Sequence, residues 1–323
     1  MIRAAVVDKS ATSVLFQDGS ELSLCRNLRA GGLRLASLGG DAIMLGPRKP
    51  NSPHGYFMAG LDRDTIWEFF QHLAEVAARE TLPRFRAPLV IDNKDAEGGF
   101  DPVTVADKAA EAALRAAITA RFPQHGIQGE EEADQRGSSV WSWIIDPIDG
   151  TRSYVCGMPT WGTLIGLLEN GVPRYGMMSQ PFTGDCFIGG AGQADLFSHG
   201  QRTRLSCRRD RDLAAATLYS TTPEMFAVGV ELDAFNTLSR AVRLTRFGAD
   251  CYGYCLLAAG YVDLVVEANL GFYDIAPLIP IIEAAGGVVT DWSGKPMRGG
   301  GRAVAAASGA LHTAALAILR TAN

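Results

Sequence analysis

The sequence predicts a mixed α/β (α+β) fold of layered helices and sheets, and two observations support this prediction. Strand patterns joined by a hairpin occupy the middle of the chain, over 160–179. The last third instead alternates helix and strand patterns. Antiparallel strands followed by alternating elements are typical of a mixed layered fold rather than of a uniform doubly wound sheet.

Composition narrows the class of protein. The 323 residues are 47% hydrophobic and carry a formal net charge of −5. That content supports a sizeable core in one large domain or two smaller ones. The net negative charge provides no basic surface of the kind that binds nucleic acid or anionic lipid. Charged residues also interrupt every apolar run well before it reaches the length of a membrane span. No Cys-x-x-Cys spacing occurs, so we expect a reduced, cytoplasmic protein without nucleic-acid or membrane partners.

Three segments are expected. Residues 1–57 read as an N-terminal extension, with a β-hairpin around an Asp18-Gly19 turn and then a linker rich in proline and glycine. Residues 58–205 are expected to form an α+β subdomain that carries the metal site described below. Residues 206–323 are expected to form an α/β subdomain.

The elements follow from periodicity and from start and stop signals. A helix is predicted from Asp64, where apolar residues recur on one face, and it ends at Pro83. A second helix is predicted over 106–122 and a buried strand over 141–145. The hairpin strands are expected at 160–168 and 172–179. The remaining predictions are helices at 250–261, 275–285 and from 310, and strands at 264–267, 288–292 and 303–307.

Carboxylates are the candidate functional residues. Asp146 and Asp149 follow the buried strand, Glu130 precedes it, and Asp274 begins a predicted helix. Two unit charges at roughly 4 Å repel by on the order of 4 kcal/mol near a protein surface, so such a cluster requires a cation. Oxygen ligands without His or Cys select magnesium-like ions. The carbonyl of Ile148 is expected to face the same ion, and the chemistry indicated is metal-assisted reaction of a phosphate.

Each of these residues also has an ordinary structural interpretation. Asp146-Pro147 is a common turn pair, although Gly150 and Thr151 after it favour an anion site. Thr104-x-x-Asp107 is a capping box at a helix start, and its functional interpretation is that Asp107 and Thr151 share a proton relay. Glu130 lies in an acidic run that is usually a solvated face. Asp274 could be a plain N-cap.

The ordered motifs resemble the inositol monophosphatase superfamily over about residues 61 to 320. They are Gly-Glu-Glu at 129–131, Asp-Pro-Ile-Asp-Gly-Thr at 146–151, Asp-Pro-Val-Thr-Val-Ala-Asp at 101–107, Glu267 seven residues before Asp274, and Glu-Ala-Ala-Gly-Gly-Val at 283–288. The resemblance implies a five-layered αβαβα sandwich of the inositol monophosphatase and fructose-1,6-bisphosphatase type. It also implies a homodimer that hydrolyses small phosphate monoesters with two or three Mg²⁺ ions.

The resemblance implies roles for individual residues. The implied metal ligands are Glu130, Asp146, the Ile148 carbonyl, Asp149 and Asp274. The implied catalytic residues are Asp107, Glu130 and Thr151, with Thr151 and Asp107 orienting and deprotonating the attacking water. The amides around Gly150 and Thr151 would hold phosphate.

Within the superfamily, the sequence is most similar to the histidinol-phosphatases. The similarity rests on Arg152, on Pro-Thr-Trp-Gly-Thr-Leu at 159–164, on Thr-Thr-Pro at 221–223 and on Arg-Phe-Gly-Ala-Asp-Cys-Tyr at 246–252. Asp250 and Glu267 would give the pocket two carboxylates that suit the ammonium and imidazole of histidinol phosphate. The alternative for Asp250 is an N-cap on the following helix. The expected substrate-binding residues are Ile148, Asp149, Gly150, Thr151, Gly248, Asp250, Glu267 and Asp274.

Two rival functions remain open at this stage. One is an inositol-1-monophosphatase or broad sugar-phosphate phosphatase, and the other is a non-catalytic regulatory module on the same fold. The sequence departs from the phosphatase relatives at 269–273, just before Asp274, and at Pro277. Both departures are expected to alter the substrate end of the pocket.

Overall fold

The computed structural model describes residues 13–18, 21–26, 62–88, 91–93 and 102–322. Contacts divide the chain into two units, Met1–Ala59 and Gly60–Asn323. In the first unit, β1 (Ser13–Asp18) pairs antiparallel with β2 (Glu21–Arg26). The predicted linker after this hairpin lies outside the described residues.

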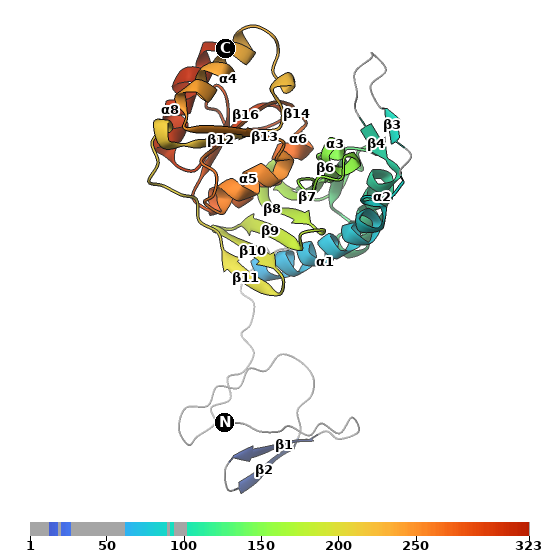
Figure 1. Ribbon diagram of the computed structural model, residues 1–323. Coiled ribbons are helices and arrows are strands. Elements are labelled where there is room, and N and C mark those ends of the chain that lie inside the picture. The colour runs from blue at the N-terminus through green and yellow to red at the C-terminus, as the bar shows by residue number, and fades with distance from the viewer. Residues whose placement is uncertain (1–12, 19–20, 27–61, 89–90, 94–101, 323) are drawn as a thin grey trace. The chain divides into compact units, whose positions relative to one another are not determined.

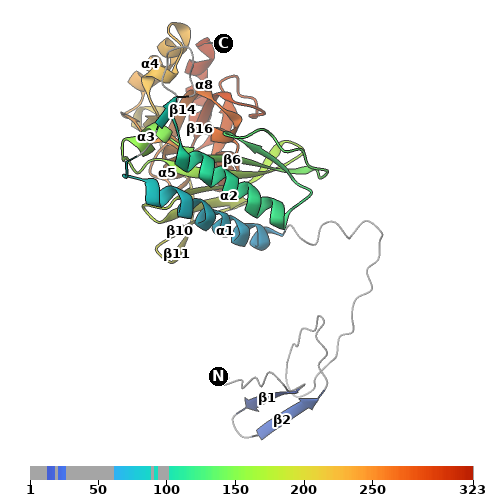
Figure 2. The ribbon, with the colours of Figure 1, turned by 90° about the vertical axis from the view of Figure 1, so that its right-hand side faces the viewer.

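The second unit has five layers in the order αβαβα, which confirms the expected fold (Figures 1 and 2). The first layer is the helix pair α1 (Arg63–Thr81) and α2 (Val105–Arg121). The middle layer consists of α5 (Asp250–Ala258), α6 (Phe272–Ile275) and α7 (Leu278–Ala284). The last layer is α4 (Val230–Ala241) with α8 (Gly309–Leu319).

A seven-stranded sheet lies between the first and middle layers, in the order β11-β10-β9-β8-β7-β6-β5. Its strands pair antiparallel except for β5 and β6, which are parallel. The hairpin predicted over 160–179 is confirmed as β7 and β8. The strands are β5 (Gly126–Gly129), β6 (Trp141–Asp149), β7 (Gly162–Glu169), β8 (Val172–Gln180), β9 (Asp185–Gly190), β10 (Gln193–Ser198) and β11 (Gln201–Arg204).

A five-stranded sheet lies between the middle and last layers, in the order β13-β12-β14-β16-β15. The pairs β12–β13 and β12–β14 are parallel, whereas β16 runs antiparallel to both of its neighbours. The strands are β12 (Thr217–Ser220), β13 (Leu244–Phe247), β14 (Leu264–Leu270), β15 (Val288–Asp291) and β16 (Gly301–Ala306).

Alternating side chains explain how each sheet is covered on both faces. In β7, Ile165 packs with α1 and α2, while Leu164 faces the middle helices. In β14, Val265 packs in the same middle core, while Leu264 and Val266 pack under α4 and α8. Because successive side chains of a strand point to opposite faces, strands that are apolar at every position must be covered twice.

The single helix predicted over 275–285 is wrong, because the chain forms two helices that meet at Pro277. Proline lacks the N–H that would continue the first helix. Pro277 packs closely on Gly166 and Gly176, and Ile281 of α7 packs on Gly189. These three glycines form a row that is paired across β7, β8 and β9. A Cβ on Gly176 would lie 1.7 Å from the carbonyl oxygen of Pro277.

The shorter elements complete the description. They are α3 (Thr151–Val155), strands β3 (Ile91–Asn93) and β4 (Pro102–Thr104), and 3₁₀ turns at Leu82–Arg84, Leu213–Ala215, Pro223–Met225 and Arg320–Ala322. Among the described residues, no helix combines the length and apolarity that crossing a bilayer requires.

Candidate active site

The carboxyl end of β6 carries the first two carboxylates. Strand β6 extends four residues beyond the predicted end, and its pairing with β7 is irregular between Asp146 and Asp149. The amide of Ile148 donates to Asp146 Oδ1 at 3.0 Å, which folds the chain back between the two acids. Asp149 Oδ2 accepts from the amide of Cys251 at 2.8 Å, so this acid also contacts the start of α5.

A sharp turn follows directly. Gly150 has φ +80°, a conformation that favours glycine, and a Cβ there would lie 2.8 Å from the carboxyl carbon of Asp250. The Thr151 hydroxyl donates to the carbonyl oxygen of Ile148 at 3.0 Å. Gly150 and Thr151 therefore line the site with little freedom to move.

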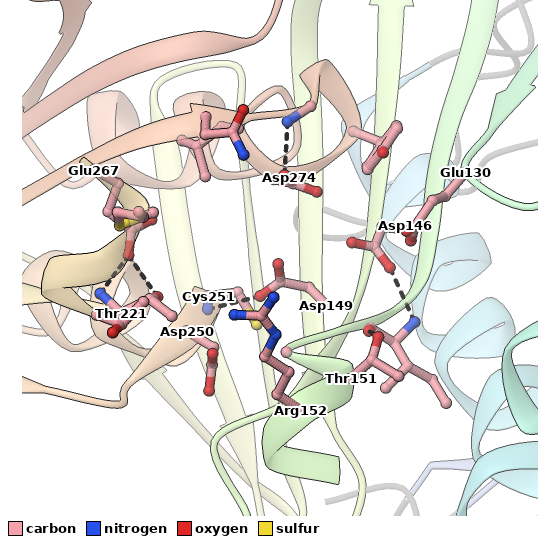
Figure 3. A pocket seen from close by; sticks show the side chains of 18 of the residues that line it. Glu130, Asp146, Asp149, Thr151, Arg152, Thr221, Asp250, Cys251, Glu267 and Asp274 are labelled. Atoms are coloured by element: carbon pink, nitrogen blue, oxygen red, sulfur yellow. Dashed lines mark hydrogen bonds between the residues drawn. The ribbon is translucent and has the colours of Figure 1, made fainter. Parts of the chain in front are cut away.

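Asp274 and Glu130 reach the same place from other elements (Figure 3). Asp274 lies in the short helix α6 and accepts from the amide of Gly271 at 2.8 Å, so it is not the N-cap residue itself. Glu130 follows β5 and lies close enough to Asp146 to raise the pKa of that acid. One oxygen from each of Asp146, Asp149 and Asp274 lies within 4.8 Å of the other two.

The electrostatics of this cluster favour a bound cation. Burial, and then the neighbouring acids, raise the pKa of Asp146 and Asp149 well above the usual value. Burial is also the main reason that the pKa of Asp274 rises to about 7. A cation would relieve this repulsion, and the all-oxygen donor set fits a hard divalent ion. The resemblance noted from the sequence motifs implies such an ion, and the residues present suit it.

Among the described residues, Asp107 and Thr151 form their hydrogen bonds with other partners, Thr104 and Ile148, rather than with each other. Asp107 Oδ2 accepts from the Thr104 amide at 2.9 Å and from its hydroxyl at 2.6 Å, which confirms the capping box at the start of α2. Its other oxygen, Oδ1, is buried and has no hydrogen-bond partner among the described residues. Burial raises the pKa of this carboxyl, against the lowering effect of Thr104.

Asp250 lines the cavity at the start of α5. Its Oδ2 accepts from the hydroxyls of Ser153 at 2.6 Å and Thr160 at 2.9 Å. The N-cap interpretation of Asp250 is wrong, because Ala249 occupies that position and Asp250 is the first helical residue, with φ +46°. Asp250 thus joins α5 to residues about a hundred positions earlier in the chain.

Glu267 also lines the cavity, and both of its carboxylate oxygens accept hydrogen bonds. It accepts from the amide and hydroxyl of Thr221 at 2.8 and 2.6 Å and from the Tyr254 hydroxyl at 3.0 Å. Burial raises the pKa of Glu267 to about 7. Gly248 does not line the pocket: it is exposed, and its amide donates to the Thr221 carbonyl at 2.9 Å.

These residues surround a cavity of about 630 Å³. Of the predicted site residues, Asp107 and Gly248 lie outside its lining, and the others form it: Glu130, Asp146, Ile148, Asp149, Gly150, Thr151, Asp250, Glu267 and Asp274. The cavity is also lined by Arg152, Thr221, Cys251 and Tyr254, for which no sequence pattern predicted a site role.

The sequence analysis also missed Glu111 and Arg115 of α2, which hold the backbone next to Glu130. A signal was available. Asp107, Glu111 and Arg115 recur every four residues, so they share one face of a helix whose other buried positions are mostly apolar. Buried polar residues on one helical face need partners, and Glu111 and Arg115 find theirs in the loop directly after Glu130.

The sequence is similar to those of known phosphatases. The sequence profile of the inositol monophosphatase family matches residues 62–323. A histidinol-phosphatase of Mycobacterium tuberculosis is 36% identical over 243 residues, 74% of this chain and 92% of that relative. The bifunctional phosphatase IMPL2, chloroplastic, of Arabidopsis thaliana is 40% identical over 230 residues, and the match spans 69% of this chain and 63% of that relative.

A solved structure shows the same fold. An inositol monophosphatase from Zymomonas mobilis superposes with a TM-score of 0.71 and 37% identity, covering 80% of this chain and 98% of that one.

Proposed function

Because the chain belongs to the inositol monophosphatase family and is therefore a phosphoric monoester hydrolase, we propose that it is a histidinol-phosphatase of histidine biosynthesis. The proposed reaction converts L-histidinol phosphate and water into L-histidinol and phosphate. The histidinol-phosphatases among its relatives support this substrate, since the M. tuberculosis protein aligns over nearly its whole length.

The observation that carries the proposal is the position of Asp250. Its carboxylate lines the cavity beside Asp149 and next to the Gly150 turn, and the hydroxyls of Ser153 and Thr160 hold it there (Figure 3). With Glu267 it gives the substrate end two acidic groups, beyond those of the cluster. The ammonium group of a cationic alcohol such as histidinol can form charge-assisted hydrogen bonds with these carboxylates, whereas inositol offers only hydroxyls.

We propose that Asp146, Asp149, Asp274, Glu130 and the Ile148 carbonyl would hold two or three Mg²⁺ ions. The ions would supply Lewis-acid stabilisation of the phosphoryl oxygens and of the leaving oxygen. The donor chemistry and the raised pKa values of the three aspartates support a divalent cation at this place.

The chain's own residues would orient the reaction. The amides around Gly150 and Thr151 would hold the phosphate, and we propose that Thr151 and Asp107 take the proton of the attacking water. The water oxygen forms the new P–O bond, and the ester oxygen leaves as the alcohol after gaining a proton. Thr151 supports this role because it lines the cavity, and Asp107 because one of its oxygens has no partner among the described residues.

The test compares phosphate release from histidinol phosphate and from inositol 1-phosphate in Mg²⁺. Histidinol phosphate should be the better substrate. Asp250→Ala should lower kcat/KM for histidinol phosphate by about 10- to 100-fold, equivalent to about 1.4–2.8 kcal/mol, because one charge-assisted contact is lost. The same change should leave turnover of inositol 1-phosphate nearly unaltered, and so should the control Asp233→Ala, at an exposed position of α4.

Equal loss on both substrates would contradict the specificity assigned to Asp250. A preference for inositol 1-phosphate would favour the second candidate, an inositol-1-monophosphatase or broad sugar-phosphate phosphatase, which the Zymomonas mobilis structure supports. Family membership argues against a non-catalytic module. The homodimer and the cytoplasmic location remain proposals; light scattering after gel filtration tests the first.

A further inference from the structure

The loop that carries Glu130 is held from helix α2. Glu111 is fully buried, and its carboxylate accepts from the amide of Glu131 at 2.8 Å and from that of Glu132 at 3.1 Å. These are the two peptide N–H groups directly after Glu130. The Glu111 side chain, from helix α2, therefore fixes the backbone directly after Glu130, the proposed metal ligand.

Arg115, one helical turn after Glu111, completes this arrangement. Its Nε donates to Glu111 Oε1 at 2.7 Å, and its terminal nitrogen donates to the carbonyl oxygen of Glu132 at 2.9 Å. Only about 9% of the Arg115 side chain is exposed. The two residues form a buried ion pair whose remaining hydrogen bonds go to the same three-residue loop.

Gly129 shows how closely the pair approaches the loop. A Cβ at this position would lie 2.0 Å from Glu111 Oε1 and 2.6 Å from a terminal nitrogen of Arg115. The φ of Gly129 is not among the positive values of the chain, so its backbone does not require glycine. The lack of a side chain is needed for space, because any larger residue would push the ion pair away from the backbone before Glu130.

We propose that Glu111 and Arg115 are positioning residues that hold the 130–132 loop so that the Glu130 carboxylate faces Asp146, and that they thereby set the affinity of the site for its divalent cation. The proposal rests on the proposed function, which makes Glu130 a metal ligand. Residues that orient metal ligands typically change metal affinity 10- to 100-fold when they are altered.

A purely stabilising role fits the geometry less well. A buried ion pair is often no more stable than apolar residues of similar size, because both charges lose hydration. Here the carboxylate is directed at main-chain amides beside the site rather than only at its arginine partner. The interaction fixes a particular backbone position, which a well-packed apolar pair could not do.

The main test measures Mg²⁺ binding to the purified full-length protein by calorimetry, together with Tm. Glu111→Gln keeps the side-chain size but places an NH₂ group where one loop amide needs an acceptor. The Mg²⁺ dissociation constant should rise about 10- to 100-fold. Turnover should recover towards the wild-type value when Mg²⁺ is raised to saturation, because Glu111 does not touch the substrate.

Asp263→Asn is a matched control. Asp263 is also fully buried, is bound by Arg208 at 2.8 Å and accepts a main-chain amide, that of Thr217, at 2.8 Å. It lies directly before β14, whereas Glu267 of the cavity lies at the middle of that strand. This variant should lose stability as Glu111→Gln does, while it binds Mg²⁺ with wild-type affinity.

A second variant keeps every charge. Gly129→Ala should displace the ion pair from the loop and weaken Mg²⁺ binding in the same way as Glu111→Gln, and it serves if Glu111→Gln fails to fold. Wild-type Mg²⁺ affinity in folded Glu111→Gln or Gly129→Ala would overturn the proposal.

Glu130→Gln distinguishes the ligand assignment of Glu130 from the positioning role of Glu111 and Arg115. If it weakens Mg²⁺ binding while Glu111→Gln does not, only the positioning role fails. If Glu130→Gln binds Mg²⁺ normally, the ligand assignment of Glu130 fails, and this inference fails with it.

Discussion

Each aspartate of the metal-ligand cluster uses one carboxylate oxygen to accept a backbone amide, which leaves the other oxygen for the cavity. The donor is the amide of Ile148 for Asp146, of Cys251 for Asp149 and of Gly271 for Asp274. The hydrogen bond fixes the rotamer of the side chain, so the second oxygen has a defined direction. A cluster held in this way can present oxygens within 4.8 Å of one another without needing the ion to arrange them.

Asp149→Asn tests the cluster at this scale. The amide oxygen of asparagine can still accept from Cys251, so the fold should remain, but one negative charge is lost. Phosphate release should fall by several orders of magnitude. The Tm measured without divalent ions should stay the same or rise, because the neutral amide escapes the burial cost and the repulsion that raise the pKa of Asp149.

Asp134→Asn serves as its control, since Asp134 is exposed in the loop after Glu130. That variant should keep wild-type activity. Near-wild-type turnover of Asp149→Asn would contradict the site assignment.

At the scale of elements, close packing between α6–α7 and the seven-stranded sheet places Asp274. Pro277 breaks the helix three residues after Asp274, and its carbonyl lies over Gly176. Further along α7, the backbone of Ile281 lies over Gly189, where a Cβ would approach its Cα to 2.3 Å. Side chains on this glycine row would lift both helices from the sheet and carry Asp274 away from Asp146.

Gly176→Ala should therefore affect both stability and metal binding. Overpacking of this kind costs about 1–3 kcal/mol, which corresponds to a Tm lower by roughly 3–10 °C in a unit of this size. Mg²⁺ binding by calorimetry should weaken as α6 moves. The matched change Gly299→Ala, where no atom would lie within 4 Å of the new Cβ, should alter neither quantity.

At the scale of the whole molecule, the cavity draws acids from both sheets. Asp146 and Asp149 lie at the end of β6 and Glu130 directly follows β5, both in the seven-stranded sheet, while Glu267 lies on β14 of the five-stranded sheet. The seven-stranded sheet ends at Arg204 and the five-stranded sheet starts at Thr217, which supports the proposed subdomains 58–205 and 206–323. The extension 1–57 remains a proposal. Several buried acids in one cavity couple the stability of the fold to pH and to the cation.

The Tm gained on adding Mg²⁺ should increase from pH 5 to pH 8. Without Mg²⁺, the folded state holds protons on Asp146, Asp149, Asp274 and Glu267 because their pKa values are raised, those of Asp274 and Glu267 to about 7. For Asp274 and Glu267, the stabilising contribution of the bound proton is complete below the unfolded pKa of about 4 and is lost as pH rises through about 7. For Asp146 and Asp149, the same contribution is lost as pH rises well above the usual carboxyl range. A bound cation offsets that loss and competes with the protons, so its benefit is largest at high pH.

Differential scanning fluorimetry in Mg²⁺ and in EDTA at matched ionic strength measures this difference. Taking the difference removes titrations far from the site, such as that of His125, whose pKa is lowered by burial. A Mg²⁺ effect that is constant or falls between pH 5 and pH 8 would contradict the assignment of these acids to one cation site.

The sequence alone determined the features that depend on neighbours along the chain. Three features could be predicted because each depends on residues close together in the sequence. They are the capping box of Thr104 and Asp107, the hairpin of β7 and β8, and the spacing of Asp146, Asp149 and Thr151. The tertiary structure decided the rest: the helix break over Gly176, the placement of Asp250 by Ser153 and the contact of Glu111 with Glu131. Those contacts join segments 20 to about 100 residues apart. They depend on which surfaces pack together, and local periodicity carries no information about that.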